Sequence, residues 1–315
     1  MSNKLTVTAS PHRRDNVSTQ KIMLMVIIAL LPSVVASAIY FGFRAILLIA
    51  ICVATCVLTE FVCRKLMKRN QTISDLSACV TGILLALNLP VTLPIWEAVI
   101  GSFVAIAVVK QLFGGIGQNF ANPAIVGRIV LMLSFTADMT TWAIPKYYQN
   151  SGEVITGATP LVSGDASYLD LFLGNVGGCL GETSALAILI GGLFLIVMKV
   201  ISPSAPISFI GTVAILTAIT GGDVGYQVLA GGLLLGAFFM ATDYSTTPIT
   251  EKGRIIFGIG CGIITFVIRN YGGYPEGVSF SILLMNVLTP YIDRLTMSKP
   301  VGAKYPEKKK EEVSK

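Results

Sequence analysis

Charged residues are scarce in this sequence. Asp, Glu, Lys and Arg make up 13% of the 315 residues, whereas hydrophobic residues make up 53% and the mean hydropathy is +0.75. A soluble globular domain carries about 25% charged residues. The scarcity therefore excludes an ordinary soluble domain and indicates an integral membrane protein that crosses the bilayer several times.

Histidine and paired cysteines are also nearly missing. The one histidine, His12, lies in the polar N-terminal segment, which excludes a histidine-dependent acid, base or metal site inside the membrane. Of the six cysteines only Cys179 lies in a long loop, so they do not form the pattern of a secreted disulfide protein. Cys52 and Cys56 share a helical face without a second pair, which favours packing over metal binding.

Apolar runs long enough to cross a membrane recur along the whole chain. A helix needs about 20 predominantly apolar residues to span the hydrocarbon. The sequence predicts ten such spans, near residues 22–42, 44–63, 74–90, 95–113, 121–138, 184–201, 205–221, 226–242, 254–270 and 278–294. The expected fold class is thus an all-α integral membrane protein.

Lysine and arginine determine the expected orientation, because positively charged loops are retained in the cytoplasm. If the N terminus lies inside, every Lys and Arg falls on or near the cytoplasmic side except Arg44, Lys146 and Arg269. Ten spans also bring the C terminus inside. We therefore expect a multi-pass membrane protein with both termini cytoplasmic.

The connection at residues 139–183 is much the longest, and this topology places it outside. Loops above about 12–15 residues are usually functional or disordered. This one contains Trp142, Leu171 and Phe172 among other apolar residues, too much apolar surface for a disordered linker, so we expect it to fold onto the membrane surface.

A short polar stretch in that loop, TGATPL, runs from Thr156 to Leu161. Proline disfavours the helical region for the residue before it, so Pro160 predicts an extended Thr159. Gly157 and Ala158 add little side-chain bulk. The stretch therefore predicts an exposed hydroxyl at Thr159.

The chain carries similar segments in its two halves. NPAIVGRIV (122–130) resembles TPITEKGRII (247–256), and EAVIGSFVAIAVVKQL (97–112) resembles YQVLAGGLLLGAFFMA (226–241). Halves of five spans have opposite orientations, so we interpret the similarity as an inverted repeat, which commonly places a site at the midplane. The expected domains are a cytoplasmic N-terminal segment (1–21), a first repeat (22–138), the outer loop (139–183), a second repeat (184–294) and a charged, disordered cytoplasmic tail (295–315).

Polar side chains occur beside Gly and Pro at the ends of two spans. They are Asn119, Asn122, Asp243 and Thr247. A proline frees a carbonyl of the preceding turn, which a nearby amide, an ion or a cofactor can satisfy. Two interpretations stay open here: an intramembrane cofactor or ion site, or plain cytoplasmic turns.

Several charged residues lie in or near spans, where a charge is costly. Arg128 and Arg254 either belong to the intramembrane site or extend to the inner surface, and the second interpretation is favoured. Glu60 has Arg64 at i+4, which predicts a structural ion pair.

Together, NFANPAIVGR, MATDYSTTP followed by a Gly-Arg pair, TGATPL after the fifth span and the duplication resemble a known family. It is the NqrB/RnfD family, which contains the D subunit of the ion-translocating oxidoreductase (Rnf) complex and the B subunit of the sodium-pumping NADH:quinone oxidoreductase. The short N-terminal region favours similarity to the Rnf member. The resemblance covers nearly the whole chain.

The resemblance implies a flavoprotein. In this family FMN is attached through its phosphate to a threonine of a motif that corresponds here to Thr156, Gly157, Ala158 and Thr159, with Thr159 as the acceptor. It also implies a noncovalent riboflavin within the membrane part. The expected partners are the other Rnf subunits (A, B, C, E and G), a flavin transferase for maturation and membrane lipid, without nucleic acid.

The implied activity is that of one subunit of a translocase, inactive alone, that relays electrons between ferredoxin and NAD with Na⁺ or H⁺ translocation. The chain has no iron–sulfur cysteine set and no dinucleotide-binding motif with the expected acidic residue, so other subunits must bind clusters and NAD. Two alternatives stay open: the quinone-reducing relative, and a non-redox inverted-repeat transporter or channel.

Overall fold

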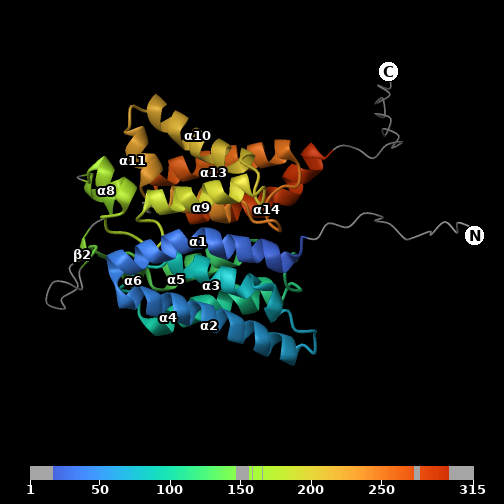
Figure 1. Ribbon diagram of the computed structural model, residues 1–315. Helices are drawn as coiled ribbons and strands as arrows, with labels where there is room; N and C mark the ends of the chain where they lie inside the picture. The colour runs from blue at the N-terminus through green and yellow to red at the C-terminus, as the bar shows by residue number, and fades with distance from the viewer. Residues whose placement is uncertain (1–16, 147–155, 158, 165, 273–276, 298–315) are drawn as a thin grey trace, which may run out of the picture.

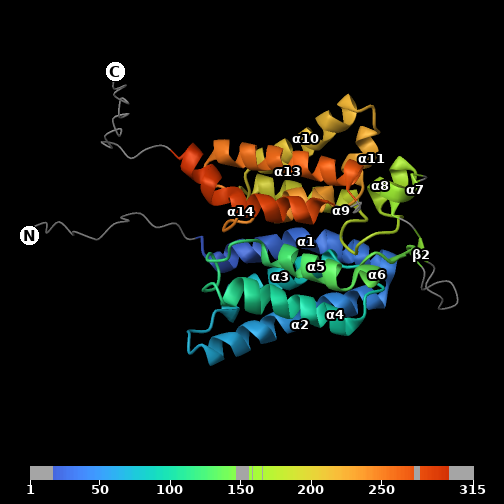
Figure 2. The ribbon, with the colours of Figure 1, turned by 180° about the vertical axis from the view of Figure 1, so that it is seen from behind.

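A computed structural model describes residues 17–146, 156–157, 159–164, 166–272 and 277–297. Most of its described residues are helical, as predicted, and the helices lie side by side in one bundle (Figures 1 and 2). The helices of the first half lie together, those of the second half lie together, and α1 packs against α9 where the halves meet.

The first half contains α1 (Thr19–Phe41), α2 (Phe43–Leu66), η1 (Ile73–Asp75), α3 (Ser77–Leu87), α4 (Ile95–Phe103), the π-helix η2 (Val104–Gln111) and α5 (Pro123–Ser134). The second contains α9 (Ala185–Val197), α10 (Ser204–Ile219), α11 (Val224–Leu229), α12 (Leu233–Leu235), the π-helix η4 (Gly236–Met240), α13 (Glu251–Tyr271) and α14 (Val278–Thr296). Each predicted span therefore has a helical counterpart. Among the described helices, α1 and α2 have both the length and the hydropathy needed to cross a membrane.

Two predicted spans differ from continuous helices. The third is short, because α3 ends at Leu87 and the chain continues without helix to Pro94. The eighth is broken between α11 and α12, where Gly231 and Gly232 have φ of +70° and +68°. Backbone of this left-handed kind interrupts a helix and is adopted readily by glycine. Hydrophobic runs alone did not reveal this break.

Arginines satisfy the carbonyls that these interruptions leave free. Arg44, at the start of α2, donates to the carbonyl oxygens of Val91 and Leu93 at 2.7 and 3.2 Å. Arg269, near the end of α13, donates to those of Ala230 and Gly231 at 3.1 and 2.9 Å. An unsatisfied carbonyl is costly in an apolar bundle, so each interruption depends on its arginine.

The two similar segments around the Gly-Arg pairs begin α5 and α13, and both helices begin at the same end of the bundle. One cavity at that end is lined by Thr19 at the start of α1, Thr247 just before α13 and Asp293 at the end of α14. Asn122, which caps α5, bonds to Met240 at the end of η4. An inverted pair would begin at opposite ends, so these motifs do not establish an inverted repeat.

The connection between the halves is folded over the opposite end of the bundle (Figure 1). It contains α6 (Thr136–Met139), the antiparallel pair β1 (Trp142–Ala143) and β2 (Thr156–Gly157), α7 (Pro160–Ser163) and α8 (Tyr168–Leu173). Trp142 and Leu171 are buried, whereas Leu169 and Phe172 are exposed. The prediction of a folded loop is confirmed for its described residues. The predicted disordered tail begins at residue 295, but residues 295 and 296 still belong to α14, and residues 298–315 lie outside the described ranges.

A glycine lets α1 and α9 pack closely where the halves meet. A Cβ built on Gly191 of α9 would lie 2.0 Å from the Ala29 carbonyl oxygen of α1. We expect Gly191→Ala to lower the free energy of unfolding by about 1–3 kcal/mol through overpacking, measured by titration with a denaturing detergent. Gly211→Ala is the matched control, because a Cβ there meets nothing within 4 Å. Alanine favours helix over glycine, so a Gly191→Ala protein as stable as the control would contradict this packing.

Candidate functional site

Thr159 has the predicted backbone but not the predicted exposure. Its φ of −63° and ψ of 152° are extended, and Pro160 begins α7 directly after it. Its side chain is only 3% exposed, so the prediction of an exposed hydroxyl is wrong. The reason lies in the tertiary structure: α7 packs Thr159 and Pro160 against Leu171 of α8 and the 229–231 break. Ala158 lies outside the described residues.

The Thr159 hydroxyl has no hydrogen-bond partner among the described residues. It lines a cavity of about 10 Å³ together with Glu182 and Thr183, whose Oε2 and Oγ1 atoms are likewise buried and unpartnered. Buried polar atoms are nearly always hydrogen-bonded, and three unpartnered oxygens around one cavity therefore require an explanation. These oxygens can accept hydrogen bonds from, or donate them to, a polar group attached at Thr159.

The broken eighth span forms the other wall of this site. A Cβ on Gly231 would lie 2.3 Å from Leu161 and 2.7 Å from an amino nitrogen of Arg269, and one on Gly232 would lie 2.6 Å from Glu182 Oε2. These two positions therefore bring α7, an arginine and a carboxylate together. The break was not predicted, although the Gly-Gly pair in the sequence signals it.

Arg128 lies inside the bundle, so the favoured prediction that it extends to the inner surface is wrong. Its side chain donates to Asn88 Oδ1 at 2.9 Å, to Ser279 Oγ at 3.1 Å and to Cys179 Sγ at 3.4 Å. These partners belong to the segment after α3, to α14 and to the outer loop. Because Gly127 and Arg128 sit in mid-helix on α5, the nearest polar partners are internal, and the guanidinium joins both halves.

Cys179 is held as a neutral thiol in this network. Burial raises its pKa to about 12, with the neighbouring Glu182 adding to the effect, while Arg128 opposes it. Glu182 thus neighbours Cys179, a partner of Arg128, and also lines the Thr159 cavity. Sequence reasoning assigned no role to Cys179 or Glu182, because neither lies in a recognisable motif.

A hydrogen bond between two side chains ties the connection at residues 139–183 to the second half. Tyr168 of α8 donates its hydroxyl hydrogen to a carboxylate oxygen of Asp223, just before α11. This hydrogen bond lowers the pKa of Asp223 and raises that of Tyr168. Both residues are solvent-exposed, so the contact orients α8 without adding much stability.

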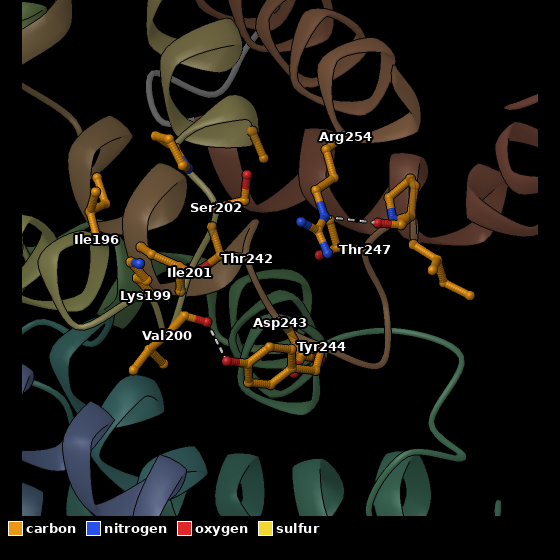
Figure 3. A pocket seen from close by; sticks show the side chains of 14 residues that line it. Ile196, Lys199, Val200, Ile201, Ser202, Thr242, Asp243, Tyr244, Thr247 and Arg254 are labelled. Atoms are coloured by element: carbon orange, nitrogen blue, oxygen red, sulfur yellow. Dashed lines mark hydrogen bonds between the residues drawn. The ribbon is translucent and has the colours of Figure 1, made fainter. Parts of the chain in front are cut away.

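The predicted intramembrane residues gather at the other end of the bundle. Asn119, Asn122 and Asp243 line one cavity of about 100 Å³. Asp243 also lines a neighbouring cavity of about 600 Å³ with Thr247 and Arg254 (Figure 3). The structure therefore brings together five of the six predicted residues, and Arg128 is the exception.

Most polar atoms of this cluster already have partners. Asn122 Nδ2 donates to the Met240 carbonyl, Thr247 Oγ1 donates to the Ala241 carbonyl, and Asp243 Oδ2 accepts from Ser245 and Thr246. Several hydrogen bonds of these residues cap the start of α5 and the end of η4. The cluster therefore also stabilises the turns at these helix ends. Arg254 is partly exposed at the bundle end, with one nitrogen 2.8 Å from Glu251.

The predicted pairing of Glu60 with Arg64 is present but is not the main contact of this carboxylate. Arg64 Nε is 3.8 Å from Glu60 Oε1, whereas Lys110 Nζ is 2.8 Å from Oε2. All three side chains are buried. Lys110 lies in the last turn of the π-helix of the fourth span, and its approach to Glu60 could not be inferred from sequence spacing. The described residues contain no group of three metal-binding side chains of the His, Cys, Asp and Glu types.

Residues 6–302 match the model of the NQR2, RnfD, RnfE family. The chain belongs to this family. The resemblance inferred from sequence motifs is thereby confirmed, and with it the assignment to a class of membrane subunits.

Individual members of the NQR2, RnfD, RnfE family match over almost their full length. The chain is 51% identical to the D subunit of the Na⁺-translocating ferredoxin:NAD⁺ oxidoreductase complex of Acetobacterium woodii, over 95% of both chains. It is 43% identical to the D subunit of the proton-translocating ferredoxin:NAD⁺ oxidoreductase complex of Clostridium ljungdahlii, over 96% of this chain and 97% of that one. It is 40% identical to the D subunit of the ion-translocating oxidoreductase complex of Stutzerimonas stutzeri, over 90% and 92%.

Loss of the Arg128 guanidinium should destabilise the bundle. Arg128→Gln removes charged donors from Asn88 and Ser279 in the interior, and we expect the free energy of unfolding to fall by about 1.5–3 kcal/mol. Arg254→Gln, at a partly exposed position, should cost about 0–1 kcal/mol. Detergent-denaturation curves of both variants measure the difference. Equal losses would show that Arg128 does not hold the two halves together.

Proposed function

We propose that this chain is the D subunit of an ion-translocating ferredoxin:NAD⁺ oxidoreductase (Rnf) complex. The observation that carries the proposal is the 51% identity to such a protein over 95% of both chains. The relatives named above translocate Na⁺ in one case and protons in another, so the coupling ion of this complex is a separate question. As one subunit among several, the chain takes part in electron transfer and does not turn over alone.

We propose further that Thr159 carries covalent FMN, joined as a phosphoester to its hydroxyl. The unpartnered Oγ1 supports this assignment, because esterification removes the orphaned hydroxyl hydrogen. Thr183 Oγ1 is available as a donor to the attached group, and Arg269 beside Gly231 supplies positive charge. When attached, the flavin supplies the redox chemistry, and these residues orient it.

A flavin transferase must reach the Thr159 hydroxyl before this side chain is buried. Because Thr159 is buried under α7, modification requires α7 to move away from the 229–231 break. The contacts that hold α7 include Leu161 against Gly231, a small apolar contact. We propose that FMN is added while the loop is open, and that the loop then packs.

The cluster at the opposite end is the proposed intramembrane site. Asn119, Asn122 and Asp243 around one cavity support a noncovalent riboflavin or an ion there. Thr247 and Arg254 extend it into the neighbouring cavity. Amide and carboxylate groups match the hydrogen-bonding edge of a flavin, and carboxylate and carbonyl oxygens match a cation.

The proposed topology places the α1 start and the α14 end in the cytoplasm, with α7 and α8 outside. Basic residues concentrate at the first end, which supports this orientation. An inverted repeat of halves 22–138 and 184–294 is proposed from helix order, because α1 packs on α9 and α5 packs on α14, the pairs that a two-fold relation would bring together. The other Rnf subunits, a flavin transferase and membrane lipid are the proposed partners.

A second candidate function is that of the B subunit in a sodium-pumping NADH:quinone oxidoreductase, which the breadth of the NQR2, RnfD, RnfE family favours. The two assignments differ in electron donor and acceptor. Membrane vesicles that reduce NAD⁺ with reduced ferredoxin support the Rnf assignment, and vesicles that reduce quinone with NADH independently of ferredoxin support the alternative.

Covalent flavin attachment can be tested on a denaturing gel. Protein made together with its flavin transferase should give a band that fluoresces under ultraviolet light, and Thr159→Ala should abolish the fluorescence because the acceptor hydroxyl is gone. Thr183→Ala is the matched control: it removes another buried hydroxyl of the same cavity and should keep the band. Thr159→Ser should keep it too. A fluorescent Thr159→Ala band, or a dark wild-type band, would rule out this acceptor.

A further inference from the structure

The 600 Å³ cavity at the end of the bundle opens between α9, α10 and α13 (Figure 3). Its wall includes Lys199 at the end of α9, Ser202 before α10 and Arg254 in the first turn of α13. The outer-end flavin site is at the other end of the molecule. The cavity thus lies at the level where a helix bundle meets lipid headgroups.

Lys199 is a free cation at the mouth of this cavity. Its side chain is exposed and has no hydrogen-bond or ion-pair partner among the described residues. Its φ is 54°, the left-handed region that favours glycine after a helix. Lys199 is therefore available to bind an anion at the edge of the cavity.

The second cation, Arg254, is only partly neutralised. Its Nε donates to the Pro248 carbonyl at 3.1 Å and one amino nitrogen lies 2.8 Å from Glu251 Oε1. Glu251 Oε2 also accepts from Ser202 at 2.9 Å. The remaining carboxylate, Asp243, is bonded to Ser245 and Thr246. The two carboxylates balance the two cations in formal charge, but Arg254 is paired with Glu251 whereas Lys199 has no ion-pair partner among the described residues.

The rim of the cavity is apolar. Tyr244 and Ile249 line the cavity and are 55% and 67% exposed. Exposed apolar side chains beside a basic pocket match the two parts of a phospholipid, acyl chain and phosphate. A soluble phosphate compound would match the cations but not the apolar rim.

We propose that this cavity binds the phosphate group of an anionic phospholipid, with Lys199 as its charged ligand and Tyr244 and Ile249 against the acyl chains. Basic pockets between helices at a membrane surface bind anionic headgroups in this way. The site is independent of covalent flavin, so its test does not depend on the flavin assignment.

The test uses the purified, delipidated complex and short-chain phosphatidylglycerol as the probe, with affinity measured by displacement of a fluorescent phosphatidylglycerol. Lys199→Gly should weaken the binding of phosphatidylglycerol about fivefold, the effect of one basic residue near an anionic lipid. Glycine suits a φ of 54°, so the variant should fold as well as the parent. Lys68→Gly is the matched control, because Lys68 follows α2 with a φ of 53°. Lys199→Arg should retain binding.

Each outcome decides the proposal. A fivefold loss in Lys199→Gly and none in Lys68→Gly supports it. Equal losses in both variants would show a general surface-charge effect and overturn it. Phosphatidylcholine that binds as tightly as phosphatidylglycerol, or inorganic phosphate that competes as well as the lipid, would also overturn the assignment to an anionic phospholipid.

Discussion

Backbone carbonyls that the interrupted helices leave free need hydrogen-bond donors, and the rest of the structure depends on this constraint. In an apolar bundle no water supplies them, and each unsatisfied group costs several kcal/mol. Arg44 and Arg269 satisfy the interruptions after α3 and α11. Arg128 plays the corresponding part between the halves by donating to side chains of the first half, the outer loop and α14. Three of the scarce charges thus stabilise the interior, two of them beside the places where helices stop.

The proposed flavin site is a consequence of one such interruption. Because Gly231 and Gly232 turn the chain away from the helix, α7 can pack close to the bundle and bury Thr159 beside Glu182. The same packing leaves buried oxygens without hydrogen-bond partners, which is unfavourable. A group attached at Thr159 would supply the missing partners. Arg269 donates to a backbone carbonyl of this break and also lies beside Gly231. It therefore links the backbone of the eighth span to the connection that contains Thr159.

Local sequence rules predicted the helices and the backbone of Thr159. Contacts between helices determined which side chains are buried and which partners they have. Hydropathy placed a helix at each predicted span, and Pro160 predicted the extended backbone of Thr159. Exposure of Thr159 depended on what packs over it, and the direction of Arg128 on which polar groups are nearest in space, so both predictions were wrong. The pairing of Glu60 with Lys110 joins residues fifty positions apart, and spacing within one helix could indicate only Arg64.

Covalent attachment of FMN to the Thr159 hydroxyl is tested most directly by peptide mapping with mass spectrometry. The complex is digested after maturation with its flavin transferase, and the peptide that contains both Thr156 and Thr159 is fragmented. The account predicts that the added mass is that of FMN less one water and that it resides on Thr159. An unmodified peptide, or FMN on Thr156 with Thr159 free, would contradict it.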